Sequence, residues 1–176
     1  FITIPNPLLY DLIQHPYFQR LRRISQMGMS YLVYPGAHHT RFHHALGCMH
    51  IMQKAIDVLR FKGVLISNEE ENALLIAILL HDIGHGPFSH TMETICNLPK
   101  GFHEDIGKRM INENEELKAK LNAVWPNLPE IMEEVEQRNF LGLNSLFEGQ
   151  IDVDRGDFLP RDSMALRLDD SNSDEI

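Results

Sequence analysis

Residues 79–90 read LLHDIGHGPFSH, and this stretch decides the expected architecture. The residues before it, Leu74 to Leu80, form an apolar run that predicts a buried helix. His81 and Asp82 end that helix and can present an imidazole nitrogen and a carboxylate oxygen to one divalent cation. A turn with Gly and Pro follows and carries His85 and His90. The stretch therefore predicts a metal site at the end of a buried helix.

Two segments far from residues 79–90 in the sequence carry further imidazole and carboxylate side chains that could bind the same cation. Residues 40–44 (TRFHH) open a helix, and residues 152–157 (DVDRGD) lie far downstream. A mixed nitrogen and oxygen shell suits Fe, Mn, Zn, Co or Ni better than Mg or Ca alone. A calcium loop at Asp152 is excluded, because Gly156, Asp157 and Ser163 stand where a ligand, a Gly and the closing Glu are needed. The three segments can supply four ligands to one ion: His44, His81, Asp82 and Asp154.

Apolar spacing predicts helices over most of the chain. The first starts at Pro7 after the cap residue Asn6, the next runs from Pro16 to Met27, and a long one runs from Thr40 to near Gly63. Ser67 and Glu70 have capping-box spacing before the helix that ends at His81. Further helices are expected after Ser89, over residues 104–114 and over residues 129–138.

Two segments are less regular in sequence. Residues 31–34 (YLVY) allow a short strand, and residues 154–162 form a final helix that Gly156 and Pro160 disfavour. The sequence predicts an all-α domain over residues 1–167 and an acidic, flexible tail over residues 168–176.

Composition narrows the class of protein. The chain has 176 residues, enough for one domain, and a net charge of −9. This charge argues against DNA and anionic membranes as partners, and no apolar run approaches membrane-spanning length. Cys48 and Cys96 have no metal-like spacing, so reduced thiols in a cytoplasmic protein are expected. Arg20, Arg22 and Arg23 are interpreted as a solvated face or interface, with nucleic-acid contact as a weaker alternative.

The sequence resembles the HD-domain superfamily of metal-dependent phosphohydrolases, and within it the deoxynucleoside triphosphate triphosphohydrolase group. The resemblance runs in order from about Pro16 to Asp162. It rests on several motifs: residues 18–22 (FQRLR), 34–37 (YPGA), 40–44 (TRFHH), 81–90 (HDIGHGPFSH), 103–104 (HE) and 152–155 (DVDR). It implies an HD-domain helical bundle with a metal site between helices, a nucleotide substrate and a homo-oligomer.

The resemblance also implies roles for individual residues. It places one divalent transition metal on His44, His81, Asp82 and Asp154, with Mg²⁺ accompanying the nucleotide as a further expectation. His85 and Glu93 lie near the scissile phosphate, and His103 joins them as a catalytic residue. Arg41, His90, His103 and Arg155 surround the triphosphate. The sugar lies near Gln26, Met27, Phe158 and Asp162.

Two positions depart from the family pattern. His43 stands where relatives often carry Glu or Gln, and Phe158 stands where Tyr is usual, which removes a hydroxyl contact. The most favoured activity is hydrolysis of a dNTP to deoxynucleoside and triphosphate. The alternatives are a phosphohydrolase for another nucleotide or phosphoester, and a metal-binding scaffold or regulator without turnover.

Overall fold

The computed structural model describes residues 2–99, 101–124, 126–128 and 152–166. The described residues form α-helices, two short 3-10 helices and one isolated bridge, without a strand. The all-α prediction is therefore confirmed. The expected helix over residues 129–138 and the expected tail over residues 168–176 lie outside the described residues. None of the described helices combines the length and apolar character that membrane crossing requires.

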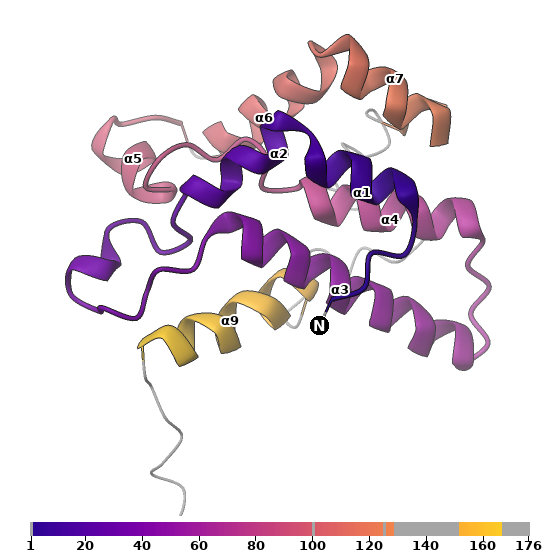
Figure 1. Ribbon diagram of the computed structural model, residues 1–176, viewed down its shortest axis with the longest axis horizontal. Coiled ribbons are helices and arrows are strands. Elements are labelled where there is room, and N and C mark those ends of the chain that lie inside the picture. The colour runs from indigo at the N-terminus through magenta and orange to yellow at the C-terminus, as the bar shows by residue number, and fades with distance from the viewer. Residues whose placement is uncertain (1, 100, 125, 129–151, 167–176) are drawn as a thin grey trace, which may run out of the picture.

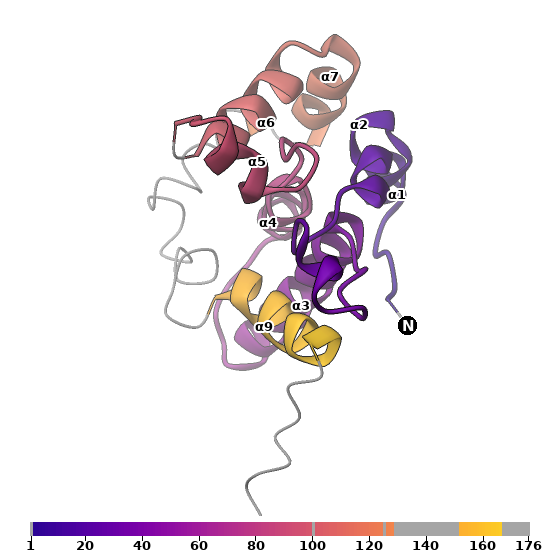
Figure 2. The same cartoon turned by 90° about the vertical axis from the view of Figure 1, so that its left-hand side faces the viewer.

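Two helices occupy the centre, α3 (Arg41–Phe61) and α4 (Asn68–Leu80), and they pack against each other. The last helix, α9 (Val153–Leu166), lies along α3 on one side (Figures 1 and 2). On the other side lie α6 (Phe102–Asn112) and α7 (Glu115–Val124). The N-terminal α1 (Pro7–Gln14), α2 (Pro16–Gln19) and η1 (Arg20–Arg23) cover the remaining face, and α5 (His90–Ile95) lies at one end.

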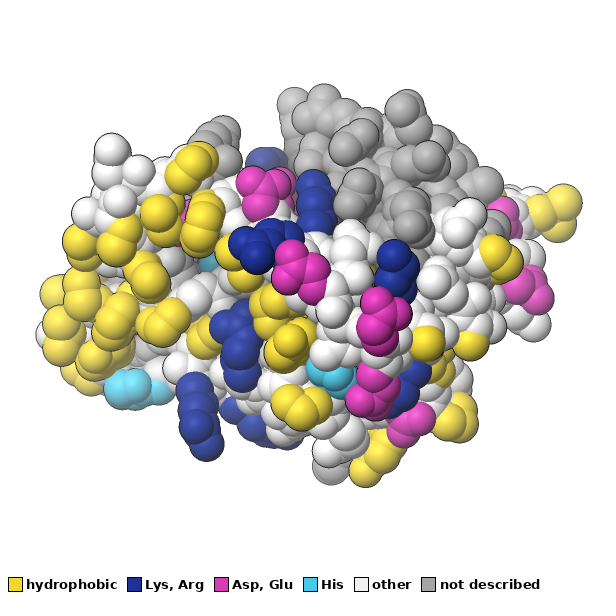
Figure 3. Space-filling view, turned by 90° about the horizontal axis from the view of Figure 1, so that it is seen from above, with side chains coloured by type: hydrophobic (Ala, Val, Ile, Leu, Met, Phe, Trp, Pro, Cys, Tyr) yellow, Lys and Arg dark blue, Asp and Glu magenta, His cyan; other side chains and the backbone are white. Residues whose placement is uncertain are grey.

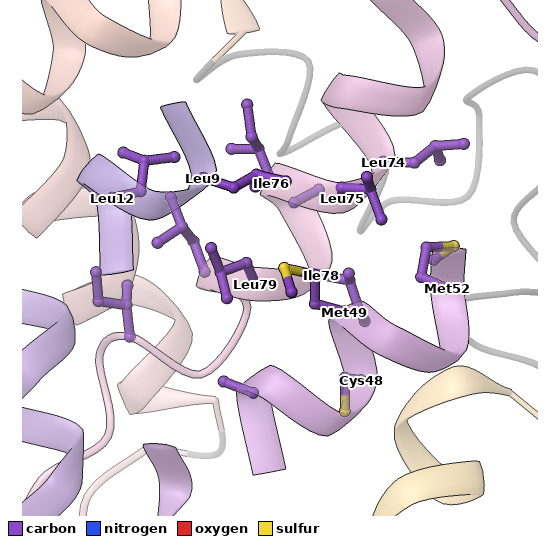
Figure 4. Packing of buried hydrophobic residues seen from close by; sticks show 14 of the residues in the cluster. Leu9, Leu12, Cys48, Met49, Met52, Leu74, Leu75, Ile76, Ile78 and Leu79 are labelled. Atoms are coloured by element: carbon purple, nitrogen blue, oxygen red, sulfur yellow. The ribbon is translucent and has the colours of Figure 1, made fainter. Parts of the chain in front are cut away.

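The core forms around α4, whose residues Ala73 to Leu80 are all buried. A helix that is apolar all round belongs in the interior. Side chains of α1 and α3 pack against it, including Leu9, Met49 and Met52 (Figure 4). Because α4 is buried along this length, its C-terminal end places His81 at the edge of the core, where its side chain is 20% exposed.

The helix starts follow the expected capping chemistry. The Ser67 N–H donates to Glu70 Oε2 at 2.7 Å and the Glu70 N–H donates to Ser67 Oγ at 3.1 Å, which completes the capping box of α4. At the start of α3, the Thr40 N–H donates to His43 Nδ1 at 3.2 Å. His43, the residue that departs from the Glu or Gln of relatives, thus accepts the same capping hydrogen bond that those side chains would accept.

The predicted continuous helix from Pro16 to Met27 is wrong. The segment instead forms the short helices α2 and η1, after which the backbone of Ile24 is extended, with φ −111° and ψ 113°. The Gln26 N–H donates to the His39 carbonyl at 3.1 Å and the Arg41 N–H donates to the Ile24 carbonyl at 2.9 Å. Backbone groups of residues 24–26 therefore bond to the chain at the start of α3, and these long-range hydrogen bonds replace those of a continuous helix.

Three other expectations are corrected. Residues 31–34 do not form a strand: the segment begins as η2 (Ser30–Leu32), closed by a Tyr34 N–H bond to the Ser30 carbonyl at 2.8 Å. The last helix is regular from Val153 to Leu166 despite Pro160, because Asp152 caps it and α3 packs along it. Helix α7 was not expected, although its buried Leu117 and Leu121 have helical spacing.

The surface carries both signs of charge. Figure 3 shows basic and acidic side chains interspersed across the middle of one face, and hydrophobic side chains gathered at its left-hand end. Figure 1 places α5 at that end, where Phe88, Met92 and Ile95 are exposed. On the described part of this face, acidic side chains thus lie among the basic ones.

Candidate metal centre and active site

The two histidines of the expected metal set come from adjacent helices. His44 lies in the first turns of α3, and His81 is the C-terminal cap residue of α4. Because α3 and α4 pack side by side, the ring centroids lie 5.4 Å apart with an interplanar angle of 72°. The two rings thus face a common point from different directions.

Two carboxylates complete the set around that point. His44 Nε2 lies 2.8 Å from Asp154 Oδ1 and 3.5 Å from Asp82 Oδ2. His81 Nε2 lies 3.5 Å from Asp82 Oδ2 and 3.7 Å from Asp154 Oδ1. Ligand atoms about 2.0–2.2 Å from one ion lie roughly 3–3.5 Å from each other. The four predicted residues therefore have the separations that one divalent ion would need.

The Nδ1 atoms of both imidazole rings already have hydrogen-bond partners. His44 Nδ1 lies 2.9 Å from Asp157 Oδ2, and His81 Nδ1 lies 2.6 Å from the Ile78 carbonyl. Both acceptors place the ring proton on Nδ1, which leaves Nε2 as the nitrogen that can ligate. Among the described residues, the buried His81 Nε2 has no hydrogen-bond partner. A buried imidazole nitrogen without a partner fits a cation at this position.

The electrostatics favour a cation in the same place. Burial lowers the pKa of His44, but the hydrogen bonds to Asp154 and Asp157 outweigh it and raise that pKa to about 9. For His81, burial lowers the pKa, but the charge of Asp82 and the nearby Asp154 carboxylate raise it to about 9. The pKa values of Asp82 and Asp154 are held well below their usual range despite burial. Ionised carboxylates beside two basic imidazoles form a set from which a divalent cation can displace protons.

Cys48 is the other possible donor near the two histidines. Its Sγ lies 3.5 Å from Nδ1 and 3.6 Å from Nε2 of His44, so the sulfur lies against the ring and not beyond Nε2. Asp82 Oδ2, by contrast, lies 3.5 Å from the Nε2 atoms of both histidines. Asp82 is therefore the better fourth ligand.

Asp157 and Arg161 form an ion pair that holds the His44 ring in place, and the sequence analysis did not expect this pair as part of the site. Arg161 donates to both Asp157 oxygens, at 2.9 Å and 2.5 Å, while Asp157 holds His44. Their spacing on one helix face, four residues apart, was a signal in the sequence for an ion pair. Gly47 makes this arrangement possible, because a Cβ there would lie 1.8 Å from Asp157 Oδ1.

Gly47→Ala is expected to lower the free energy of unfolding by about 1–3 kcal/mol, as overpacked interiors do. It should also weaken metal binding, because Asp157 would have to move away from His44. The matched control is Gly156→Ala in α9, where a Cβ would meet its nearest neighbour at 3.8 Å. That control should be neutral or stabilising by up to about 1 kcal/mol. Chemical denaturation measures both, and equal effects of the two variants would contradict the packing argument.

A second group of histidines surrounds the turn after Asp82. His85 Nε2 lies 3.2 Å from Asp82 Oδ1, and the His85 ring stacks on His103 with centroids 3.9 Å apart. Glu93 Oε1 lies 2.7 Å from His103 Nδ1, and its other oxygen lies 3.2 Å from His90 Nδ1. The structure thus brings the expected catalytic residues together beside the metal set, with a carboxylate orienting each of His85 and His103.

The protonation of this group differs from that of the metal set. Burial lowers the pKa of His85 to about 4, against the raising effect of Asp82. Burial raises the pKa of Glu93, but the hydrogen bonds to His90 and His103 outweigh burial, so the pKa lies below its usual value. His85 is therefore neutral near pH 7 while Glu93 is ionised. Among the described residues, the buried His85 Nδ1 has no hydrogen-bond partner.

Arg41 is buried between the two groups with 5% of its surface exposed. Its Nη1 donates to Asp82 Oδ2 at 2.5 Å and its Nε donates to Ser89 Oγ at 3.1 Å. Ser89 itself has φ 50° and ψ −133°, a strained conformation for a residue other than glycine. Strain of this kind persists where the surrounding structure enforces it and is concentrated at functional sites.

Arg20 corrects the expectation of a solvated arginine face. It is half-buried, and its guanidinium donates to the carbonyls of His85, at 2.7 Å, and Ile83. Arg22 lies over the Phe42 ring at 3.6 Å from its centroid. Arg20 therefore holds the backbone of the turn that carries His85.

A cavity of about 480 Å³ opens beside both groups of residues, a volume in the usual range for ligand sites. Met27 and Arg155 are absent from its described lining, although the resemblance placed them near the nucleotide. Two residues that the sequence analysis did not expect, Glu104 and Lys108 of α6, line it. Its other lining residues are Gln26, Arg41, Ile78, His81, Asp82, His85, His90, His103, Asp154, Phe158 and Asp162.

Several known proteins are similar to this chain in sequence and in fold. The HD domain family model matches residues 41–159. The uncharacterized protein YwfO of Bacillus subtilis is 40% identical over 166 residues, which are 93% of this chain and 37% of that protein. The deoxynucleoside triphosphate triphosphohydrolase SAMHD1 homolog of Dictyostelium discoideum is 31% identical over 190 residues, covering 94% of this chain and 34% of that protein.

The fold likeness extends over nearly the whole chain. A crystal structure of a phosphohydrolase from Bacteroides thetaiotaomicron has a TM-score of 0.81 and 41% sequence identity to this chain. The match covers 97% of this chain and 41% of that one. The chain therefore spans well under half the length of each of these relatives.

Proposed function

This chain belongs to the HD domain family of metal-dependent phosphohydrolases, and we propose that it hydrolyses a phosphate bond of a nucleotide. The favoured reaction is conversion of a dNTP to deoxynucleoside and triphosphate. The observation that carries the proposal is that two neighbouring groups of residues both contribute side chains to the wall of one cavity. One group has nitrogen and oxygen donors spaced for a divalent ion, and the other has histidines that carboxylates hold in place.

His44, His81, Asp82 and Asp154 would hold one divalent transition metal. Such an ion lowers the pKa of a ligated water and neutralises a phosphate oxygen. Asp157 and the Ile78 carbonyl orient the two imidazoles. Which of Fe, Mn, Zn, Co or Ni occupies the site is a matter for elemental analysis, and Mg²⁺ accompanying the nucleotide stays a prediction.

His85 would exchange a proton with the reacting phosphate ester, because it lines the cavity, its Nδ1 has no hydrogen-bond partner among the described residues, and its Nε2 is held by Asp82. Glu93 would keep His103 and His90 oriented toward the phosphates. The Arg41 guanidinium would stabilise negative charge as the ester bond breaks. Lys108 also lines the cavity and would contact the triphosphate. The contact of Arg155 with the triphosphate stays a prediction.

Substrate choice rests on the sugar end of the cavity, lined by Gln26, Phe158 and Asp162. The Dictyostelium relative, a deoxynucleoside triphosphate triphosphohydrolase homolog by name, supports a deoxynucleoside triphosphate as the substrate. Side chains packed near the 2′ position would exclude a ribonucleotide sterically, so dNTPs should be preferred over NTPs. Phe158 lacks a hydroxyl and should weaken this preference relative to relatives with Tyr. The homo-oligomer implied by the family resemblance stays a prediction.

The test is to incubate metal-loaded protein with a panel of dNTPs, NTPs and a generic phosphodiester and to identify the products by anion-exchange chromatography. Release of intact triphosphate from dNTPs is the expected result. Orthophosphate or pyrophosphate would contradict the triphosphohydrolase reaction and favour another phosphohydrolase of the family. Absence of all turnover with metal bound would contradict an enzymatic function and favour a metal-binding scaffold.

A further inference from the structure

A second cavity, of about 300 Å³, lies between η1, the turn that follows Asp82, α5 and α6. Its volume is at the lower end of those usual for ligand sites. Among the described lining residues, it shares only His103 with the cavity beside the metal set. Much of its wall is hydrophobic and consists of Met92, Leu98, Phe102, Ile106 and Met110. A wall of this kind suits a small apolar molecule better than a nucleotide.

One face of α6 gives this second cavity a direction. Phe102, Ile106 and Met110 are four residues apart along the helix, so they share one face. At 1.5 Å of rise per residue, this face is about 12 Å long. Met110 Sδ lies 3.7 Å from Arg20 Nη2. The Arg20 guanidinium therefore lies at the Met110 end of the apolar face.

Arg20 brings a half-buried positive charge to that end. Its guanidinium donates to the carbonyls of His85 and Ile83, and it forms no ion pair with a carboxylate among the described residues. Burial lowers the pKa of Arg20, as expected for a cation that leaves water without a counter-charge. A guanidinium has five N–H donors, so two carbonyls leave donors for a further acceptor. An anionic group in the cavity would supply the missing counter-charge.

We propose that the second cavity binds a small molecule that has an apolar chain or ring and one carboxylate group. The carboxylate pairs with Arg20, whose planar guanidinium matches carboxylate geometry, and the apolar part lies along Phe102 and Ile106. Glu93 also lines the cavity, although its oxygens are hydrogen-bonded to His90 and His103. Because of this nearby negative charge, a singly charged carboxylate fits better than a doubly charged phosphate. The binding site goes beyond the proposed function and does not depend on it.

The wall of the second cavity includes residues that hold the catalytic group. His103 lines both cavities, and Glu93, which accepts from the His103 N–H at 3.1 Å and lies 2.7 Å from His103 Nδ1, lines the second one. A molecule in the second cavity would therefore change the surroundings of the His103 ring. The ring resonances of His103 thus report whether the cavity is occupied.

Isothermal titration calorimetry of the metal-loaded chain with octanoate, octanol and acetate tests the ligand class. One octanoate should bind per chain. Octanol should bind roughly tenfold more weakly or worse, because it lacks the charge that strengthens a hydrogen bond to Arg20, and acetate should not bind because it lacks the apolar part. Arg20→Gln should remove the difference between octanoate and octanol. Absence of octanoate binding, or equal affinities of wild type for octanoate and octanol, would overturn the proposal.

Variants of α5 test the location and leave Arg20 in place. Met92 lines the cavity and is exposed, so Met92→Glu should fold and weaken octanoate binding roughly tenfold or more through like-charge repulsion. Met92→Gln, of similar size without the charge, should have a much smaller effect. The matched control is Ile95→Glu, on the same helix but outside the described lining. Equal losses in Met92→Glu and Ile95→Glu would contradict binding in this cavity.

A carboxylate is also a metal ligand, so the metal centre has to be excluded as the binding site. Octanoate affinity should be unchanged in Asp154→Ala, and loss of binding in that variant would overturn the proposal. In NMR spectra of the histidine rings, octanoate should shift His103 and not His50, which lies on α3 outside both described linings. An unshifted His103 in octanoate-bound protein would likewise overturn it. Failure to hydrolyse any nucleotide would contradict the proposed function and leave these binding results decisive.

Discussion

Asp82→Ala is expected to abolish stoichiometric binding of a divalent transition metal and all metal-dependent turnover. Asp82 Oδ2 lies 3.5 Å from the Nε2 atoms of both His44 and His81, so its loss removes a charged ligand from the centre of the set. It also leaves Arg41 buried without its counter-charge. Breaking a buried pair in this way costs about 3–5 kcal/mol, so the variant has to be checked for folding by circular dichroism.

Asp154→Ala keeps the test decisive if Asp82→Ala fails to fold. Asp154 is more exposed than Asp82 and does not take part in the buried ion pair that Asp82 forms with Arg41. The control is Asp57→Ala, which removes an exposed carboxylate from the same helix that carries His44. Metal titration followed by elemental analysis should give one ion per chain for wild type and Asp57→Ala. A full complement of metal in folded Asp154→Ala would refute its role as a ligand.

His85→Ala is expected to keep the metal and lose roughly 10²–10⁴ in turnover, the usual contribution of a positioned acid or base. His85 contacts Asp82 through Nε2 but lies outside the four-residue set, so metal content should be unaffected. His50→Ala, on α3 and outside the cavity lining, is the matched histidine control. Normal turnover by metal-loaded His85→Ala would exclude a catalytic role for this residue.

The sequence predicted the features that depend on local chemistry. A continuous apolar run predicted the buried α4, and the capping-box spacing of Ser67 and Glu70 predicted where it starts. The His81–Asp82 pair at the end of this buried helix predicted a metal site there, and the family resemblance implied that the site lies between helices. The family assignment is confirmed by the match to the HD domain model. The metal and catalytic roles of individual residues stay predictions that the geometry supports.

Long-range contacts explain what the sequence did not predict. Arg20 appeared to belong to a charged surface, but its partners are backbone carbonyls more than 60 residues away. The same holds for His39, whose partner Asp162 lies 123 residues away. Pro160 disfavours a helix locally, yet packing against α3 maintains α9. In each case, tertiary structure and not local propensity determines the outcome.

X-ray absorption of the metal-loaded protein distinguishes the possible ligands, because it reports which atoms bind the ion. We expect a first shell of nitrogen and oxygen at about 2.0–2.2 Å, supplied by His44, His81, Asp82 and Asp154. Cys48 is close enough to His44 to offer the competing donor. A sulfur ligand at about 2.3 Å, or a bound ion with no imidazole in its shell, would contradict the proposed site.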